Sequence, residues 1–304
     1  MKYQKILGHL GALLAVACWG ISFISTKVLL ESAHLTPIEV FVYRFAIAYV
    51  FLFCITFKQI FAHNWKDELQ LMFCGVCACS LYYILENYAL QYTTTGNVSL
   101  LSSISPLMTT ALMVLVFRKK VGAGVVIGSV IAFIGVGFVI FGDKHTLEIN
   151  PLGDLLALAS ALSWAIYSIA SKNLIPVYNT LFITRKLFLY GVLTALPFMF
   201  LQRSPSHFSE VFSKIDYLFN LGFLALFCSL ISFVVWNFSM RELGPVNSNK
   251  YIYMIPIVTL VAAYIVFGEQ IAVMGWIGCA MVIGGLVVTD KLKIKSVGIR
   301  HIRK

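Results

Sequence analysis

The chain has 304 residues, of which 60% are hydrophobic and 12% are charged, and its formal net charge is +10. A soluble domain carries about twice that charged fraction, so the composition excludes an ordinary cytosolic enzyme, a disordered tail and a secreted disulfide scaffold. Its mean hydropathy of +0.88 indicates an all-helical protein that crosses a membrane many times, because lipid cannot hydrogen-bond an exposed backbone.

Ten apolar segments are each long enough, at roughly 20 residues, to cross a bilayer as a helix. The first follows Lys2 and Lys5 like a signal peptide, but its apolar run continues past Cys18, so we interpret it as a membrane helix. The ten predicted spans are residues 8–31, 38–57, 69–91, 95–117, 121–141, 154–174, 181–201, 217–240, 246–268 and 271–290.

Basic residues indicate the orientation of these spans. If the N-terminus is cytoplasmic, 14 Lys and Arg residues lie on the cytoplasmic side and three, Lys144, Arg203 and Lys214, on the other. Positive charge favours the cytoplasmic side, so both termini are predicted to be cytoplasmic. The basic tail, residues 291–304, is expected to lie against anionic lipid headgroups. Because the basic residues lie between apolar runs, membrane lipids are the expected partner and nucleic acid is not.

The two halves of the sequence repeat each other. Residues 8–27 align with 153–172 at an offset of 145, and later matches follow at an offset of 150. Each half contains five spans, so the second half enters the bilayer inverted relative to the first. Inverted repeats are typical of secondary transporters, whose substrate site lies near the midplane between the halves. The most informative identical pairs are Trp19 and Trp164, Lys27 and Lys172, Asn87 and Asn237, Asn97 and Asn247, and Pro106 and Pro256.

These features resemble the EamA-type members of the drug/metabolite transporter superfamily over nearly the whole chain. The matching motifs are Trp19-Gly20 with Lys27, the prolines Pro106 and Pro256, and Phe267-Gly268-Glu269. The resemblance implies two EamA-like five-helix repeats, residues 1–142 and 150–290, around a central cavity. It also implies export of small metabolites or amino acids across the bacterial inner membrane. The first repeat departs from the family by having Arg118-Lys119-Lys120 where an acidic residue is common, so Glu269 is interpreted as a structural helix-end residue.

Ionisable residues inside the spans are the first candidates for a substrate site, because each costs roughly 2.5–3.5 kcal/mol there unless it faces a cavity or a partner. Arg44 could bind a substrate carboxylate, pair with Glu39 or Glu86, or extend to the membrane surface. Glu86 has Tyr82 on the same helical face. Its carboxylate could carry a proton, bind a cationic substrate, or neutralise Arg44 or Lys27.

A polar stripe marks the fourth and ninth spans. Lys250 could meet an anion in an inward-open state or extend to headgroups, and the serines of span four could line a cavity or pack helices. Because proline removes a backbone hydrogen bond and kinks a helix, Pro106 and Pro256 are predicted hinges. The full candidate substrate site is Trp19, Arg44, Tyr82, Glu86, Asn97, Ser102, Ser103, Trp164, Asn247, Lys250 and Tyr253.

Other motifs define the alternatives. Cys74, Cys77 and Cys79 resemble a metal or redox motif, but no second Cys or His cluster completes a four-ligand site. No phosphate-binding loop is present, so we expect neither a metal nor a cofactor. The predicted function is a secondary transporter of a small molecule, with the proton as one candidate coupling ion. The alternatives are a membrane thiol redox enzyme, a channel and a non-transporting receptor. Small-residue faces around Gly128 and Gly278 predict close helix packing, either within the chain or in a homodimer.

Overall fold

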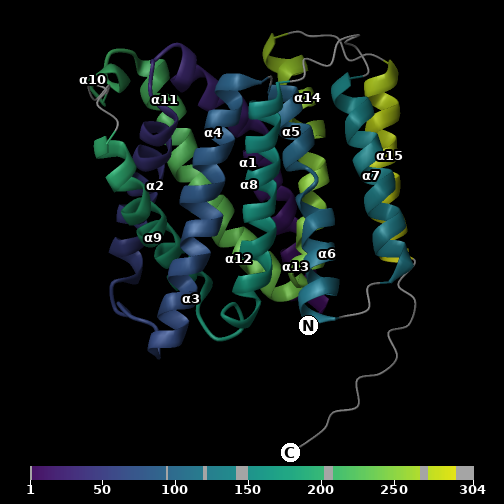
Figure 1. Cartoon of the computed structure of the whole chain (residues 1–304), viewed down its shortest axis with the longest axis horizontal. Coiled ribbons are helices and arrows are strands. Elements are labelled where there is room, and N and C mark those ends of the chain that lie inside the picture. The colour runs from purple at the N-terminus through teal and green to yellow at the C-terminus, as the bar shows by residue number, and fades with distance from the viewer. Residues whose placement is uncertain are drawn as a thin grey trace, which may run out of the picture.

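The computed structural model describes residues 2–93, 95–118, 122–141, 150–201, 208–267 and 273–291. These residues form ten helical segments that run side by side through one bundle, and a four-residue helix, α10 (Phe208–Val211), lies at one end of it (Figure 1). Seven segments are apolar and long enough to span a membrane. The predicted all-α membrane fold with ten transmembrane helices is therefore confirmed. The basic tail from residue 292 onward lies outside the described residues.

The ten segments begin and end close to their predicted bounds, except that several contain an internal break. They are α1 (Lys2–Glu31); α2 (Pro37–Thr56); α3 (Trp65–Gly75), η1 (Val76–Leu81) and α4 (Tyr82–Tyr92); α5 (Thr95–Ser102) and α6 (Ser105–Phe117); α7 (Ala123–Phe141); α8 (Pro151–Ala170) and η2 (Ser171–Asn173); α9 (Thr180–Leu201); α11 (Ile215–Phe223), η3 (Leu224–Ile231) and α12 (Ser232–Leu243); α13 (Pro245–Asn249), η4 (Lys250–Met254) and α14 (Ile255–Phe267); and α15 (Val273–Lys291).

Helix caps explain several of these boundaries. Thr36 and Glu39 form a capping box at the start of α2, in which each side chain accepts a hydrogen bond from the other residue's backbone N–H. Asn150 caps α8 by accepting a hydrogen bond from the backbone N–H of Gly153 at 3.1 Å. In both helices a proline follows the cap, where its missing N–H costs nothing. These local signals separate neighbouring spans that composition alone would merge.

The third and eighth spans both contain a π-helical segment, which the hydropathy pattern did not predict. The segments η1 and η3 occupy matching positions in the two repeats. A π-bulge disturbs the regular hydrogen-bond ladder and makes carbonyl groups available to other partners. Accordingly, the Cys77 carbonyl accepts a hydrogen bond from the Ser163 hydroxyl at 2.7 Å, and the Cys228 carbonyl accepts one from the Trp19 indole at 2.9 Å. The bulges thus tie the third and eighth spans to the sixth and first.

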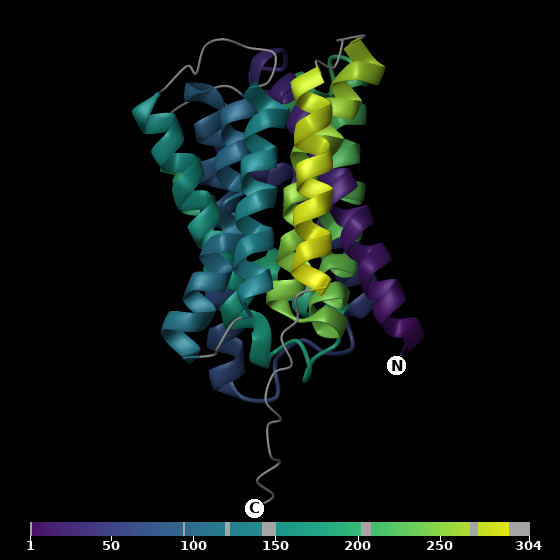
Figure 2. The same ribbon diagram turned by 90° about the vertical axis from the view of Figure 1, so that its right-hand side faces the viewer.

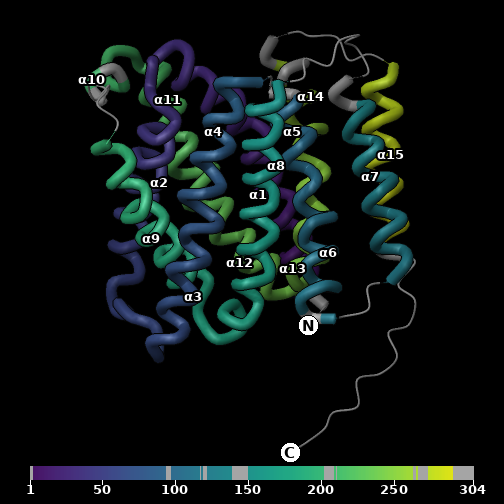
Figure 3. Tube along the Cα trace, in the orientation of Figure 1, coloured from purple at the N-terminus to yellow at the C-terminus, as the bar shows by residue number. Residues whose placement is uncertain are grey.

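Helix contacts reveal the inverted repeat. Helix α1 packs on α12 and α14, and its counterpart α8 packs in the same way on α4 and α6. The repeat mates α2 and α9 also pack together, as do α7 and α15. The two halves interleave (Figure 3), since α12 of the second half packs against α1 of the first. Helix α1 begins and α15 ends at the same end of the bundle (Figure 2), as ten crossings require. The predicted inverted repeat is therefore confirmed.

The small-residue faces pack against each other within the chain. A side chain added at Gly128 would lie 2.4 Å from the Gly285 carbonyl oxygen, and one added at Gly135 would lie 2.8 Å from the Gly278 carbonyl oxygen. The backbones of α7 and α15 therefore approach as closely as glycine allows. These faces are used inside the monomer, so they give no support to a dimer.

Candidate functional site

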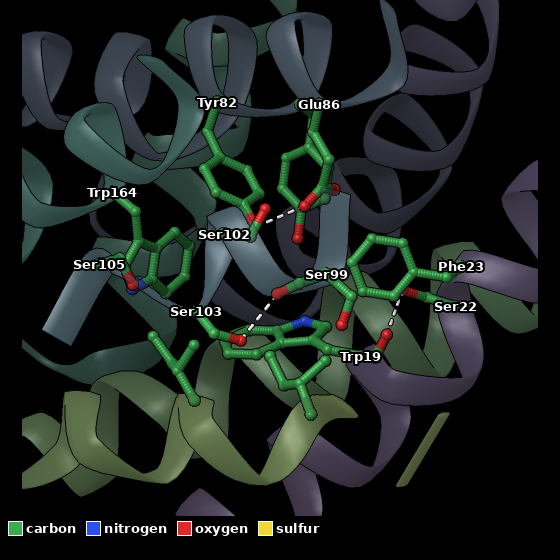
Figure 4. A pocket seen from close by; sticks show the side chains of 13 residues that line it. Trp19, Ser22, Phe23, Tyr82, Glu86, Ser99, Ser102, Ser103, Ser105 and Trp164 are labelled. Atoms are coloured by element: carbon green, nitrogen blue, oxygen red, sulfur yellow. Dashed lines mark hydrogen bonds between the residues drawn. The ribbon is translucent and has the colours of Figure 1, made fainter. Parts of the chain in front are cut away.

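A cavity lies between helices of both repeats (Figure 4). Helices α1, α4, α5 and α6 contribute from the first half, and α8, η4 and α14 contribute from the second. The lining residues are Trp19, Ser22, Phe23, Tyr82, Tyr83, Glu86, Ser99, Ser102, Ser103, Ser105, Trp164, Ile252 and Ile255. Six of the eleven predicted site residues are in this set: Trp19, Tyr82, Glu86, Ser102, Ser103 and Trp164.

One side of the cavity carries an acidic group. Glu86 lies one helical turn beyond Tyr82 on α4, and the Tyr82 hydroxyl donates a hydrogen bond to Glu86 Oε1 at 2.6 Å. Figure 4 shows both side chains extending from the same helix toward the cavity. Of the described residues that line the cavity, Glu86 is the only acidic one, and none is Lys, Arg or His. The only formal charge that a carboxylate, ammonium, guanidinium or imidazole of the described lining residues can give the cavity is therefore the negative charge of Glu86.

A serine-rich wall forms where the fourth span is broken. Helix α5 ends at Ser102 and α6 starts at Ser105, with Pro106 in its first turn. The Ser103 hydroxyl donates to the Ser99 carbonyl at 2.7 Å. The hydroxyl oxygens of Ser99 and Ser102 are buried and have no hydrogen-bond partner among the described residues. Unsatisfied hydroxyls beside a cavity are available to a ligand.

Two tryptophans, which are repeat mates, occupy the centre of the bundle. The Trp19 and Trp164 rings meet edge to face with centroids 5.2 Å apart. The Trp164 indole N–H donates to Asn249 Oδ1 at 3.2 Å, and the Asn249 amide donates to the Thr109 hydroxyl at 2.7 Å. These hydrogen bonds fix the Trp164 indole, and the bond to the Cys228 carbonyl fixes the Trp19 indole.

Arg44 lies behind the cavity wall. Its side chain is 1% exposed, its Nε donates to the Ser229 hydroxyl at 2.9 Å, and its guanidinium lies 4.7 Å from the centroid of the Tyr83 ring. Among the described residues, no carboxylate oxygen lies within 4.0 Å of it, so neither expected ion pair, with Glu39 or with Glu86, is formed. Nor does Arg44 extend to the membrane surface.

The other four predicted site residues also lie away from the cavity lining. Asn97 and Asn247 each donate to the end of the preceding span, to Thr93 Oγ1 just after α4 and to the carbonyl of Leu243, the last residue of α12. Lys250 is 3% exposed and does not extend to headgroups, and Tyr253 is fully buried. Tyr253 packs instead in the small cluster formed by Ala132, Val136 and Val282 of α7 and α15. Hydropathy places these residues inside spans but does not say which way each side chain points.

The lining residues that sequence reasoning did not single out are mostly neighbours of those it did. Ser22 and Phe23 lie one turn beyond Trp19 on α1, and Tyr83 adjoins Tyr82. Helical spacing from Trp19 could have suggested the first two. Tyr83 could not have been found in this way, because adjacent residues normally point in different directions on a helix.

A buried ion pair at the end of the bundle that carries the N-terminus was also missed. Lys186 Nζ and the Tyr190 hydroxyl both donate to Glu68 Oε1, and the Ala62 backbone N–H donates to Glu68 Oε2 at 2.6 Å. Nearby, burial and a hydrogen bond to Asp67 raise the pKa of the Tyr178 phenol. These bonds hold the loop after α2 and the loop after η2 against α3 and α9.

The comparison with known proteins decides the family. The model of the EamA-like transporter family matches residues 6–141 and again residues 151–289. The chain belongs to the EamA-like transporter family. An uncharacterised transporter of Archaeoglobus fulgidus is 25% identical to this EamA-like transporter over 275 residues, which are 90% of this chain and 95% of that protein. A probable amino-acid metabolite efflux pump of Salmonella typhimurium is 24% identical over 285 residues, 91% of this chain and 92% of the pump.

A solved structure supports the same fold. A crystal structure with 18% sequence identity to the EamA-like transporter superimposes with a TM-score of 0.72, over 95% of this chain and 96% of the other. The predicted family and the predicted transporter class are confirmed by these matches. The relatives are transporters, so the thiol redox enzyme considered from the sequence is not supported.

The cysteine cluster gives a direct test of that point. Cys74, Cys77 and Cys79 are at most 4% exposed, and the described residues contain no group of His, Cys, Asp and Glu arranged to hold a metal ion. Buried thiols of this kind act as small apolar side chains. We expect the triple alanine variant of the EamA-like transporter to take up substrate with an unchanged KM in proteoliposomes. Loss of uptake by a folded triple variant would contradict this expectation.

Proposed function

We propose that this EamA-like transporter is a secondary transporter that exports a small metabolite or an amino acid across the bacterial inner membrane by alternating access. The observation that carries the proposal is a central cavity whose polar and aromatic lining comes from both halves of the inverted repeat. Inverted repeats supply two related states in which such a site opens to either side. The name of the Salmonella relative, an efflux pump, supports export as the direction.

Two contacts between the halves support the proposed alternating-access movement. Between the cavity and the end that carries the N-terminus, His9 Nδ1 and the Tyr251 hydroxyl lie 2.6 Å apart, joining α1 to η4. The Asn249–Thr109 hydrogen bond joins the halves at a second point. Opening the cavity toward that end requires both contacts to break. Pro106 and Pro256 follow irregular segments in the two repeats and are the proposed hinges.

The proposed orientation places both termini in the cytoplasm, in agreement with the excess of basic residues on that side. The proton is the proposed coupling ion, with Glu86 as its carrier, because this carboxylate is the acidic group at the cavity. Facilitated exchange without a coupling ion is the competing arrangement. A homodimer is also part of the proposal, and the small-residue faces of α7 and α15 do not form its interface because they pack together within the chain.

Transport into proteoliposomes tests this function. Purified protein is assayed with a pooled set of labelled amino acids and metabolites, with and without a pH gradient. We expect saturable flux, enhanced by the gradient, that is lost in Glu86→Gln because the variant cannot exchange a proton. Glu31→Gln is the matched control, since Glu31 is an exposed carboxylate paired with Lys27. Saturable flux that ignores the gradient would contradict proton coupling, and conductance without saturation would contradict the transporter mechanism.

A further inference from the structure

Among the described residues, no Lys or Arg forms an ion pair with the carboxylate of Glu86, and the buried Arg44 acts on it only across a longer distance. Glu86 is 7% exposed. The two ion pairs among the described residues are Lys27–Glu31 and Lys186–Glu68. The hydrogen bond from Tyr82 reaches one of its two oxygens. A buried carboxylate in a membrane protein is normally compensated by a cation, by a proton or by solvent in a cavity. A direct ion-pair partner on the cavity side of Glu86 is therefore missing, and a cation that enters the cavity would supply it.

Aromatic rings surround the same space. Trp19, Phe23, Tyr82, Tyr83 and Trp164 line the cavity together with Glu86. The faces of such rings attract cations, and Trp and Tyr do so most strongly. The guanidinium of Arg44 already lies against Tyr83 but does not itself line the cavity. A single carboxylate among several rings, without a lining Lys or Arg, favours an ammonium group over an anion.

The serines Ser99 and Ser102 place a second requirement on a molecule that binds in the cavity. Ser99 Oγ and Ser102 Oγ line the cavity, are buried and lack partners among the described residues. In the view of Figure 4, the Ser99 side chain lies between the Glu86 carboxylate and the Trp19 indole. A serine hydroxyl can donate one hydrogen bond and accept two, so these serines suit a neutral polar group as well as a carboxylate. The occupant should therefore carry a hydrogen-bonding group beside its ammonium.

We infer that the cavity binds a small amine, whose ammonium group contacts Glu86 and the aromatic rings and whose second polar group contacts Ser99 and Ser102. The inference rests on the proposed function in taking this cavity as the substrate site. It narrows the proposed substrates from small metabolites in general to amines, because binding requires an ammonium group and does not require a free carboxylate. Amino amides and amino alcohols fit as well as amino acids do, whereas N-acylated counterparts do not.

Calorimetric binding to the full-length protein in detergent tests the inference without requiring transport. The probes are L-leucinamide, L-leucine and N-acetyl-L-leucinamide, with glycinamide and L-phenylalaninamide to cover smaller and larger side chains. We expect at least one free amino amide to bind, and its N-acetyl form to bind more weakly by about tenfold or more, because a charge-assisted contact is lost. Glu86→Gln should weaken binding of the amine by a similar factor, and Glu31→Gln should leave it unchanged.

Two further variants separate the contacts. Ser99→Ala with Ser102→Ala should weaken binding of L-leucinamide more than binding of isopentylamine, which lacks the amide group. Equal affinity for free and acetylated amides, no effect of Glu86→Gln, or no binding of any free amine by folded protein would each overturn the inference. Glu86-dependent amine binding without flux in liposomes would instead contradict the proposed transport function. Saturable flux of solutes that lack an ammonium group would support transport and contradict the amine class.

Discussion

Replacing Gly285 with alanine is expected to destabilise the protein strongly, although it adds a single methyl group. A Cβ at this position would lie 2.5 Å from the Gly128 carbonyl oxygen and 2.7 Å from the Ala132 backbone nitrogen. Both neighbours are backbone atoms of α7 and cannot move aside as a flexible side chain would. The two helices must therefore separate along their shared face, and overpacking of this kind costs about 1–3 kcal/mol.

The adjacent glycine provides a matched control. Gly284 lies on the same helix, and a Cβ built there meets no heavy atom within 4 Å. Gly284→Ala should leave stability unchanged or raise it slightly, since alanine favours a helix over glycine by about 0.8–1.0 kcal/mol. Thermal unfolding in detergent, followed by scanning fluorimetry, compares the two variants directly. Equal melting temperatures for Gly284→Ala and Gly285→Ala would show that α7 and α15 are not in close contact in solution.

The membrane-spanning segments could be predicted from the sequence, because they depend on hydrophobicity and charge summed over each segment. Long apolar runs, loop charges and the pairing of Trp19 with Trp164 are visible without coordinates. The π-helical segments η1 and η3 could not be predicted, because both lie inside uninterrupted apolar runs. Whether such a segment winds as an α- or a π-helix depends on neighbours such as Trp19 and Ser163, which bond to its freed carbonyls.

The lining of the cavity was predicted only in part, for a different reason. Polarity inside an apolar span marks a residue as unusual, and Glu86, Ser102 and Ser103 were found in this way. The same criterion selected Arg44 and Lys250, which are equally polar but lie outside the cavity lining. Whether a polar residue lines the cavity depends on the direction in which its side chain leaves the helix. That direction changes at breaks such as the one between α5 and α6. A span treated as one regular helix assigns some of these directions wrongly.

Replacing Lys186 with methionine should cause the largest loss of stability, because it leaves the carboxylate of Glu68 buried without its ion-pair partner. The two side chains are 2% and 6% exposed. The ammonium also lies near three aromatic rings, with centroids 5.0 Å away for Phe61, 5.8 Å for Phe182 and 5.4 Å for Tyr190. Removing one partner of a buried pair costs about 3–5 kcal/mol.

A second substitution should recover much of the stability that Lys186→Met loses. Glu68→Gln added to Lys186→Met removes the unpaired charge, while the glutamine oxygen still accepts the hydrogen bond that the Ala62 backbone N–H gives to Glu68. A double-mutant cycle measured by unfolding in detergent gives the coupling between the two residues. The same cycle on Lys27 and Glu31, which lie 3.5 Å apart with side chains 45% and 66% exposed, should give at most about 0.5 kcal/mol. The two pairs differ chiefly in their exposure to solvent. Equal coupling energies would therefore mean that water reaches Glu68. They would also mean that this pair does not hold the loops after α2 and η2.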